Sequence, residues 1–283
     1  MFYLGNAQIF DQMKNALSLA CLLLVGSLLS TSSFAQSNTL FNPDYNGDGF
    51  IGVDDILGAL SFYDTAWDGP VSPSWSCGEA ITYAGLGYST VQIGDQCWFA
   101  ENLRTTTYLN GDAIPQNLSD GDWFSTTSGA MAIYNDDLMA QTASGGLYNW
   151  YAVDDARGLC PSGWHVPTDG EWMTMEMALG MSEADANSTG WRGTDQGTQM
   201  KTTYGWYDDG NGTNSSGFSG LPGGYRYFNG SFYDAGYYGL WWSSSPDGSF
   251  AWFRDLNYFD DDIFRSNNDR RSGFSVRCVR DAE

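Results

Sequence analysis

Residues 159–172 read LCPSGWHVPTDGEW and contain the start signal of a helix. Thr168 is followed three residues later by Glu171, which is the capping-box pattern. In it the threonine hydroxyl accepts a hydrogen bond from the glutamate amide, and the glutamate side chain reaches back to the threonine amide. The pattern predicts a helix from Asp169 to about Met181. Its apolar side chains at helical spacing would share one face: Trp172, Met175 and Leu179.

Short apolar runs on either side of this helix predict strands. The candidate strands are residues 90–93, 96–100, 240–244, 251–256 and 274–279. In the last run, alternation would direct Phe274, Val276 and Cys278 to one face and Ser275 and Arg277 to the other. Aromatic residues make up 16% of the chain, which also has 35 glycines, and this composition favours strands and loops over long helices. We expect an α+β domain with mostly antiparallel strands.

The first 35 residues have the layout of a secretory signal peptide. Ala16 to Leu29 form an apolar run that follows Lys14 and precedes a small-x-small cleavage pattern ending at Ala35. The run is shorter than the about 20 residues that a membrane-spanning helix needs. We therefore expect a secreted protein, extracellular or periplasmic, with no membrane span in the mature chain.

The chain after residue 35 divides into three parts. Residues 36–67 form a small unit, and residues 68–74 form a linker of proline, glycine and serine without periodicity. Residues 75–283 are one continuous region, rich in aromatic residues and glycine, with no internal repeat of fixed period. We expect this region to be a single large domain.

Four cysteines remain after cleavage, and an even number in a secreted chain indicates two disulfides. Cys77 and Cys97 flank what reads as one hairpin, while Cys160 precedes the predicted helix and Cys278 lies in the last strand. We expect the pairs Cys77–Cys97 and Cys160–Cys278. Zinc ligation needs close pairs of cysteines such as C-x-x-C, and the sequence contains none.

Residues 44–55, DYNGDGFIGVDD, have the oxygen spacing of a calcium-binding loop. Calcium takes six to eight oxygen ligands, and a twelve-residue loop with alternating donors and a glycine at its sharp bend can wrap around it. The expected ligands are the side chains of Asp44, Asn46, Asp48 and Asp55 and the backbone carbonyl of Phe50. An aspartate at the twelfth position, followed by an amphipathic helix, resembles the loop–helix half of a dockerin. Only one half is present, so we expect a calcium-stabilised spacer.

The chain is strongly acidic, with 34 Asp and Glu against 12 Lys and Arg and a net charge of −22. Removal of the signal peptide takes away Asp11 and Lys14 and leaves the net charge unchanged, with Lys201 as the single lysine. Nucleic acids and anionic membranes both need clustered basic residues. We expect neither as a partner.

Six segments resemble, in order, the family called the Fibrobacter succinogenes major paralogous domain. They are VQIGDQCWFAENLR (91–104), GLYNWYAV (146–153), LCPSGWHVPTDGEW (159–172), GFSGLPGG (217–224), WWSS (241–244) and GFSVRCVR (273–280). The resemblance covers most of residues 75–283. It implies a C-type-lectin-like fold, with long loops on an α/β scaffold whose first and last strands pair. That fold hosts sugar binders, protein binders and oxidases, so it does not fix a function.

The residues exclude several activities of that fold. The sequence has no Glu-Pro-Asn, Gln-Pro-Asp or Trp-Asn-Asp tripeptide, which the calcium sugar site of lectins uses. The oxidases need two cysteines near the C-terminus, and only Cys278 lies there. His165 is the single histidine, and its place between Trp164 and Val166 just before the helix cap favours a structural role in the core. Trp98, Trp150 and Trp172 are expected in the core with Trp164.

The C-terminal loops, residues 225–271, are the expected ligand surface. They combine aromatic rings for stacking with arginines that can bind hydroxyl or carboxylate groups. We select Tyr225, Trp252, Arg254 and Tyr258 as ligand-binding candidates. Plain core packing of these aromatic residues is the alternative.

Two classes of function remain open from the sequence. The favoured one is a non-catalytic binding or display protein that recognises carbohydrate or an extracellular protein. The other is an enzyme of extracellular carbohydrate processing that uses a pair of carboxylates. The lone histidine, the missing cysteine pair and the shortage of lysine favour the first.

Overall fold

The computed structural model describes residues 75–137, 139 and 144–282. Its strands are β1 (Ile81–Tyr83), β2 (Leu86–Tyr88), β3 (Thr90–Ile93), β4 (Gln96–Phe99), β5 (Met131–Ala132), β6 (Leu147–Asn149), β7 (Gly190–Arg192), β8 (Gly223–Arg226), β9 (Phe232–Ala235), β10 (Tyr238–Asp247), β11 (Phe250–Asn257), β12 (Ile263–Asp269), β13 (Gly273–Phe274) and β14 (Val279–Asp281). Its helices are α3 (Asp120–Ser125), α5 (Trp150–Val153), α6 (Asp169–Ala178), α7 (Glu183–Asn187) and α8 (Gln196–Met200), with 3-10 turns η1 (Tyr134–Asp136) and η2 (Tyr207–Asp209). The expected signal peptide, calcium loop and linker lie outside the described residues.

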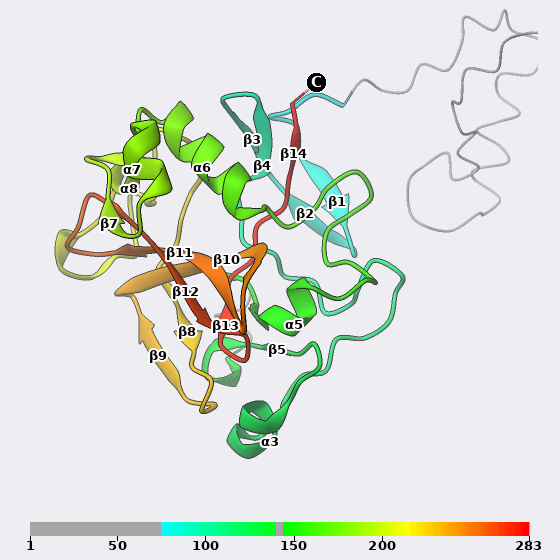
Figure 1. The fold of residues 1–283 in the computed structure, drawn as a ribbon. Coiled ribbons are helices and arrows are strands. Elements are labelled where there is room, and N and C mark those ends of the chain that lie inside the picture. The colour runs from blue at the N-terminus through cyan, green and yellow to red at the C-terminus, as the bar shows by residue number, and fades with distance from the viewer. Residues whose placement is uncertain (1–74, 138, 140–143, 283) are drawn as a thin grey trace, which may run out of the picture. The chain divides into compact units, whose positions relative to one another are not determined.

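A nine-stranded sheet organises the domain, with the long hairpin β10–β11 near its middle (Figure 1). The order is β5-β6-β13-β8-β10-β11-β12-β7, and β9 pairs with β8. Among the described ladders only β8 and β10 run parallel, and the other pairs are antiparallel. The mostly antiparallel architecture that the sequence predicts is therefore confirmed.

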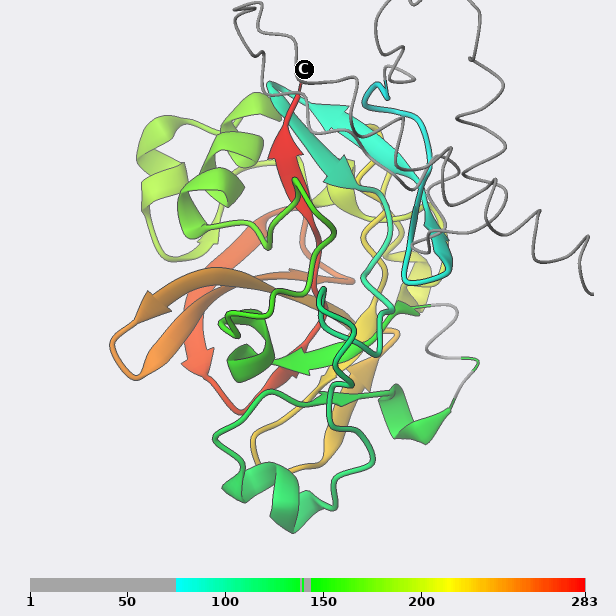
Figure 2. The same ribbon diagram turned by 90° about the vertical axis from the view of Figure 1, so that its right-hand side faces the viewer.

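A second sheet joins the beginning of the domain to its end. Strands β3 and β4 form the hairpin expected at residues 90–100, and β14 pairs with β4, Val279 opposite Trp98. In Figure 2, β14 (red) lies beside the teal hairpin, with the light-green helices next to it. A two-stranded sheet, β1–β2, completes the described strands.

The stretch 274–279 does not form the single alternating strand that we expected. The structure divides it into β13 and β14, and the residues between them are buried on both faces, Ser275 and Arg277 included. The Arg277 guanidinium donates to the carbonyls of Phe99 and Phe218 at 2.7 Å and to that of Ser219 at 3.0 Å. Burial lowers the pKa of Arg277 to about 9. Alternation fails here because the segment passes between two parts of the core, so neither face meets water.

Helix α6 begins as the capping box predicts. The Thr168 hydroxyl accepts from the Glu171 amide, and the Glu171 carboxylate accepts from the Thr168 amide at 2.7 Å. The helix ends at Ala178, a few residues earlier than expected, because Gly180 adopts φ +99°. The Gly180 amide donates to the Met177 carbonyl and the Met181 amide to the Glu176 carbonyl. This is a Schellman motif, which ends a helix at a left-handed residue.

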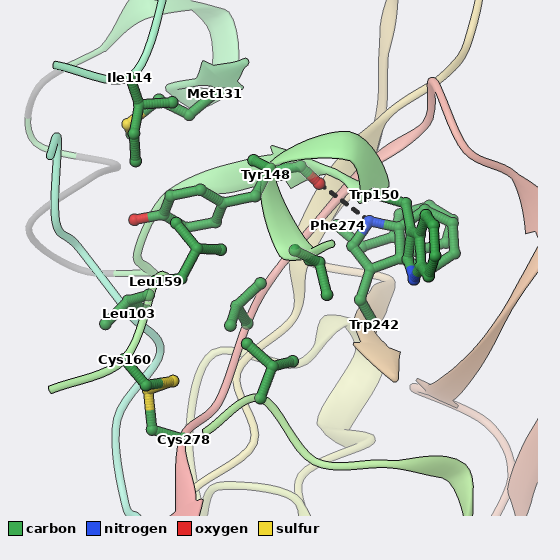
Figure 3. Close-up of a cluster of buried hydrophobic side chains, with 14 of the residues drawn as sticks. Leu103, Ile114, Met131, Tyr148, Trp150, Leu159, Cys160, Trp242, Phe274 and Cys278 are labelled. Carbon is green, nitrogen blue, oxygen red and sulfur yellow. Dashed lines mark hydrogen bonds between the residues drawn. A yellow bond between two sulfur atoms is a disulfide. The ribbon is translucent and has the colours of Figure 1, made fainter. Parts of the chain in front are cut away.

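Two large hydrophobic clusters, a small third one around Trp123 and two disulfides hold the domain together. Figure 3 shows the first cluster, in which the Trp242 indole donates to the Tyr148 carbonyl at 2.9 Å beside Phe274. The second cluster packs the apolar face of α6 against the large sheet. Its members include Trp98, Trp172 and Met175, and Trp150 belongs to the first, whereas Trp164 is only half-buried.

The disulfides join the cysteines in the expected pairs. Cys77 bonds to Cys97 and Cys160 to Cys278, each with Cα atoms 5.8 Å apart. Cys160 and Cys278 lie within the first cluster (Figure 3). This bridge fixes the segment before α6 to the segment before β14.

Candidate functional site

Arg254, a predicted ligand residue, is part of the core and not of a surface. Its side chain is 0% exposed. Its guanidinium donates to Glu176 Oε1 at 2.6 Å and to Asp169 Oδ1 at 2.7 Å. The prediction for Arg254 is therefore wrong. Its side chain points from β11 toward α6, where two carboxylates of that helix bind the guanidinium.

Arg254 belongs to a buried ion-pair network that ties α6 to three strands. Arg192 of β7 binds Glu176 Oε2 at 2.5 Å, and Arg265 of β12 binds Asp169 Oδ2 at 2.6 Å. Burial alone would raise the pKa of Asp169, but the two guanidinium partners outweigh it and the pKa is lowered. The arginines of residues 225–271 therefore serve mainly to join secondary structure, and Arg226 is buried as well.

The other three predicted ligand residues are half-buried. Tyr225 packs against the first hydrophobic cluster, and the Arg265 guanidinium lies 4.1 Å over the Trp252 ring. Tyr258 packs against the edge of the second cluster and also joins a group of exposed rings. Tyr225 also lies beside an exposed ring, that of Tyr233 at 5.7 Å, whereas Tyr258 belongs to a group of rings that three loops contribute.

We call Tyr207, Tyr237, Tyr258 and Phe259 the tyrosine cluster. Tyr207 and Tyr237 stack with ring centroids 4.5 Å apart and planes 28° apart, and Tyr258 stands edge-on to both at 5.5 Å. Phe259 follows at 5.0 Å from Tyr258. Tyr207 is 50% exposed and Phe259 62%. Rings of this kind offer flat apolar faces together with phenolic hydroxyls.

Three loops from distant parts of the sequence build the tyrosine cluster. The Tyr207 amide donates to the Gly236 carbonyl at 2.8 Å, and the Tyr258 amide donates to the Tyr237 carbonyl at 3.0 Å. These backbone bonds fix the loops to one another, so the rings sit on a rigid support. Rigid aromatic rings contact a ligand at a low cost in conformational entropy.

Lys201 holds the third of these loops in place. Its ammonium group, which is buried, donates to the carbonyls of Asn257 at 3.1 Å and Asp260 at 2.9 Å. Burial lowers the pKa of Lys201. The Asn257 side chain accepts from the amides of Phe259 and Asp260. Lys201 therefore shapes the loop and is shielded from solvent.

Carboxyl groups surround the tyrosine cluster. Asp208, Asp209 and Asp234 are exposed next to it in sequence, and Asp260 follows Phe259. Asp255 lies behind them in β11, where burial, and then the charges of Asp234 and Asp260, raise its pKa well above the ordinary value. The local field is thus negative and repels anionic ligands.

Tyr207 was missed by the sequence analysis. It lies in residues 201–222, a stretch with few regular elements, and it reaches Tyr237 and Tyr258 only through the folding of the chain. The available signal in the sequence was that Tyr207 precedes two aspartates; in the structure both aspartates adopt positive φ, +51° at Asp208 and +57° at Asp209, in a tight turn. Such a turn cannot be predicted from the residue types alone.

His165 is exposed, so its expected place in the core is wrong. Its side chain is 49% exposed, and Nε2 lies 2.5 Å from Glu171 Oε1. The other oxygen of Glu171 caps α6. The histidine supports the helix start from outside because residues 161–165 turn along the surface before Val166 enters the core.

We expect this pair to make stability depend on pH. The hydrogen bond to Glu171 raises the pKa of His165 above 6.5, so its stabilising contribution is complete below pH 6.5 and is lost as the pH rises through the folded-state pKa. Burial raises the pKa of Glu171, but the bonds from His165 and Thr168 outweigh it, and the net effect is a pKa below 4.5. Its contribution is present above pH 4.5 and is lost as the pH falls through the lowered pKa. The variant His165→Ala should lose melting temperature relative to wild type at about pH 5.5 and little at about pH 9. An equal loss at both pH values would contradict the pairing.

A pocket of about 340 Å³ lies elsewhere, lined in part by Thr127, Tyr151, Asp154, Asp155 and Arg157. Its arginine is already paired, with Asp155 at 2.8 Å and with Asp112 at 3.1 Å. The bond from Arg157 lowers the pKa of Asp155 to about 2. Because Arg157 already pairs with two aspartates, this pocket is a weaker candidate for a ligand-binding site than the tyrosine cluster.

Within residues 75–137, 139 and 144–282, no group of three or more His, Cys, Asp or Glu side chains is placed to hold a metal ion. No helix among these residues has the length and apolarity to cross a membrane. The predicted calcium ligands lie in residues 44–55, outside these ranges.

These features define a disulfide-bonded, mostly antiparallel domain that presents aromatic loops on a rigid sheet. The model of the Fibrobacter succinogenes major domain family matches residues 91–280, more than half of the chain. The protein therefore belongs to that family. No curated protein and no solved structure matches the chain.

Proposed function

We propose that this is a secreted or cell-surface, non-catalytic binding protein whose large domain recognises carbohydrate through the tyrosine cluster. The observation that carries the proposal is the stacked and perpendicular arrangement of exposed rings, held by backbone hydrogen bonds between loops. Sugar rings stack their C–H faces on aromatic rings, and neighbouring hydroxyl and carboxylate groups accept their hydroxyl protons. An extracellular protein is the other ligand class that such a surface suits.

Charge supports a neutral or cationic glycan over an acidic one. The chain carries a net charge of −22, and the exposed carboxylates beside the rings belong to Asp208, Asp209 and Asp234. Uronic acids and sulfated sugars would be repelled from such a surface. The disulfides support a location outside the cytoplasm, since such bonds persist in oxidising compartments.

The proposal extends to the fold and to the N-terminal region. Pairing of β14 with β4 is consistent with a C-type-lectin-like architecture, whose terminal strands pair. We assign residues 1–35 to a signal peptide and residues 36–67 to a dockerin-like unit that binds Ca²⁺ through Asp44, Asn46, Asp48, Phe50 and Asp55. In this arrangement calcium orders the small unit and takes no part in glycan binding.

The test is glycan binding by a variant without the stacked pair. Replacing Tyr207 and Tyr237 together with alanine should weaken binding of neutral oligosaccharides at least about tenfold, a loss of about 1.4 kcal/mol, because the stacking faces disappear. Isothermal titration calorimetry with glycans selected on an array gives the measurement. EDTA should leave the affinity of the wild-type protein unchanged.

Phe250→Ala is the matched control, since Phe250 is an exposed aromatic residue at the opposite end of the β10–β11 hairpin. It should bind as wild type does. Unchanged affinity in the double variant, with its fold intact, would place the ligand surface elsewhere.

A second candidate function is glycoside hydrolysis by a pair of carboxyl groups. One observation favours it: Asp255 has a raised pKa and lies close enough to Asp234 and Asp260 to feel their charges. A protonated carboxyl beside ionised ones is the pattern of an acid and its partner in glycosidases. The binding function predicts that no new reducing ends form when the protein is incubated with glycans that it binds.

A further inference from the structure

The pocket of about 340 Å³ is lined mainly by the loop of residues 127–129 and by the end of α5. Asn149, which is fully buried, donates to the Ser128 carbonyl at 2.9 Å and accepts from the Ala130 amide at 2.9 Å. The same side chain accepts from the Ala152 amide at 3.0 Å and so caps the start of α5. One buried residue therefore ties the loop to the helix that lines the pocket with it.

Gly129 lets this loop lie directly on the Tyr108 side chain. A Cβ atom at position 129 would overlap the Tyr108 hydroxyl and would come within 3.0 Å of Ala152 Cα, so the close approach requires a glycine. The Arg157 guanidinium lies 3.9 Å from the centroid of the Tyr108 ring, where it pairs with Asp155. The protein's own contacts therefore hold the walls of the pocket in place, and preformed walls bind a ligand at a low cost in entropy.

Four polar side chains of the lining are uncommitted. They are the hydroxyl groups of Thr127, Ser128 and Tyr151 and the carboxylate of Asp154, which no hydrogen bond or ion pair engages among the described residues. Three of these residues are exposed, and Tyr151 is half-buried. A ligand in the pocket can therefore reach all four groups, in contrast to the paired guanidinium of Arg157.

The uncommitted groups suit a small, neutral ligand rich in hydroxyl groups. A protein hydroxyl can both donate and accept, and a carboxylate can accept from two ligand hydroxyls. The carboxylates of Asp112, Asp154 and Asp155 outnumber the guanidinium of Arg157, so the local charge repels anions. The volume lies at the small end of the range for ligand pockets, and the Tyr151 ring adds a flat face. A single sugar residue matches this size and chemistry.

We propose that this pocket is a second carbohydrate site of the domain. It takes one neutral sugar residue, with the sugar hydroxyls bound by Thr127, Ser128 and Asp154 and the sugar ring beside Tyr151. The site is separate from the tyrosine cluster, whose residues do not line it, but the choice of a sugar as the ligand rests on the proposed function. Two sites on one domain let a long or branched glycan bind at two places, which raises its overall affinity.

Saturation-transfer NMR on the protein without its signal peptide tests the site. The probes are the methyl glycosides of glucose, galactose, mannose and xylose, because a pocket for one sugar residue binds such molecules without the rest of a glycan. The wild-type protein should bind at least one of them. Ethanolamine is included as a cationic probe, since an ammonium group is the other ligand that the carboxylates would attract.

Thr127→Trp and Asp154→Ala are the test variants. The larger side chain at position 127 fills the pocket, so binding of the glycoside should be lost. Removal of the Asp154 carboxylate takes away a charged hydrogen-bond acceptor and should weaken binding at least about tenfold. Both variants should fold, because both side chains are exposed and uncommitted. Asp95→Ala is the control: it removes an exposed aspartate from the turn between β3 and β4 and should bind as wild type does.

The outcomes separate the pocket from the proposed function. No binding of any glycoside, or binding that survives Thr127→Trp or keeps its full strength in Asp154→Ala, would overturn the second site and leave glycan binding by the tyrosine cluster standing. Loss of glycoside binding in the double variant of Tyr207 and Tyr237 would assign the single sugars to the tyrosine cluster instead.

Two further results concern the ligand class. Tighter binding of ethanolamine than of any glycoside, lost in Asp154→Ala, would overturn the assignment of the pocket to a sugar. Glycoside binding in the pocket, together with unchanged oligosaccharide affinity in the double variant of Tyr207 and Tyr237, would overturn the proposed function of the tyrosine cluster and leave the pocket as the carbohydrate site.

Discussion

Replacing Arg254 with alanine should lower the free energy of unfolding by about 3–5 kcal/mol, the cost of breaking a buried ion pair by removing one partner. Arg254 neutralises Glu176, which is fully buried, and shares Asp169 with Arg265. Without it, Glu176 retains only Arg192, and a cavity opens between α6 and β11. Denaturant unfolding monitored by tryptophan fluorescence measures the change.

Arg157→Ala provides the matched control for Arg254→Ala. Arg157 also binds two aspartates, but it lies at the surface, where water and salt screen such pairs and they add little to stability. The two variants should therefore differ several-fold in the stability they lose. A loss at Arg254 as small as that at Arg157 would mean that the buried network does not stabilise the fold.

Removal of the Cys160–Cys278 disulfide should have an effect of similar size. The bridge closes 118 residues, and the loss of chain entropy in the unfolded state predicts about 4–5 kcal/mol for a loop of that length. The double variant Cys160→Ala with Cys278→Ala, measured by denaturant unfolding, tests this. Because both sulfurs lie in the first hydrophobic cluster, repacking adds to the loss.

The Cys77–Cys97 bridge supplies the comparison within the same protein. It closes only 20 residues, so its removal should cost about 3 kcal/mol. A greater loss from the shorter bridge would show that local strain or packing, and not loop length, decides the contribution of each disulfide.

Local signals in the sequence predicted the elements that depend on neighbouring residues. The capping box at Thr168 and Glu171 predicted the start of α6, and the hairpin of β3 and β4 followed from short apolar runs around a glycine turn. The cysteine pairs could be predicted because each cysteine lay next to a recognisable element. For the helix and the hairpin, the residues that cause the structure lie within a few positions of it.

The predictions were wrong where the contacts that decide a residue's position come from a distant part of the sequence. Arg254 reads as a surface residue among aspartates, but its partners Asp169 and Glu176 come from a helix about 80 residues earlier. Arg277 departs from the expected inward–outward alternation of residues 274–279 for the same reason. Its guanidinium donates to the backbone carbonyls of Phe99 and Phe218, which lie far from it in the sequence. For the candidate site, Tyr258 was predicted, whereas Tyr207 and the role of Asp255 required the folded loops.

The pairing of β14 with β4 has a consequence for how this domain can be joined to others. The guanidinium of Arg280 lies 5.1 Å over the ring of Trp75, so the chain enters and leaves the domain at one place. A domain whose two ends lie close together can be inserted into a surface loop of another protein, or repeated in tandem, without separating the parts of the chain on either side of it. Each inserted copy would then be connected to its neighbours through the side of the domain where β4 and β14 pair.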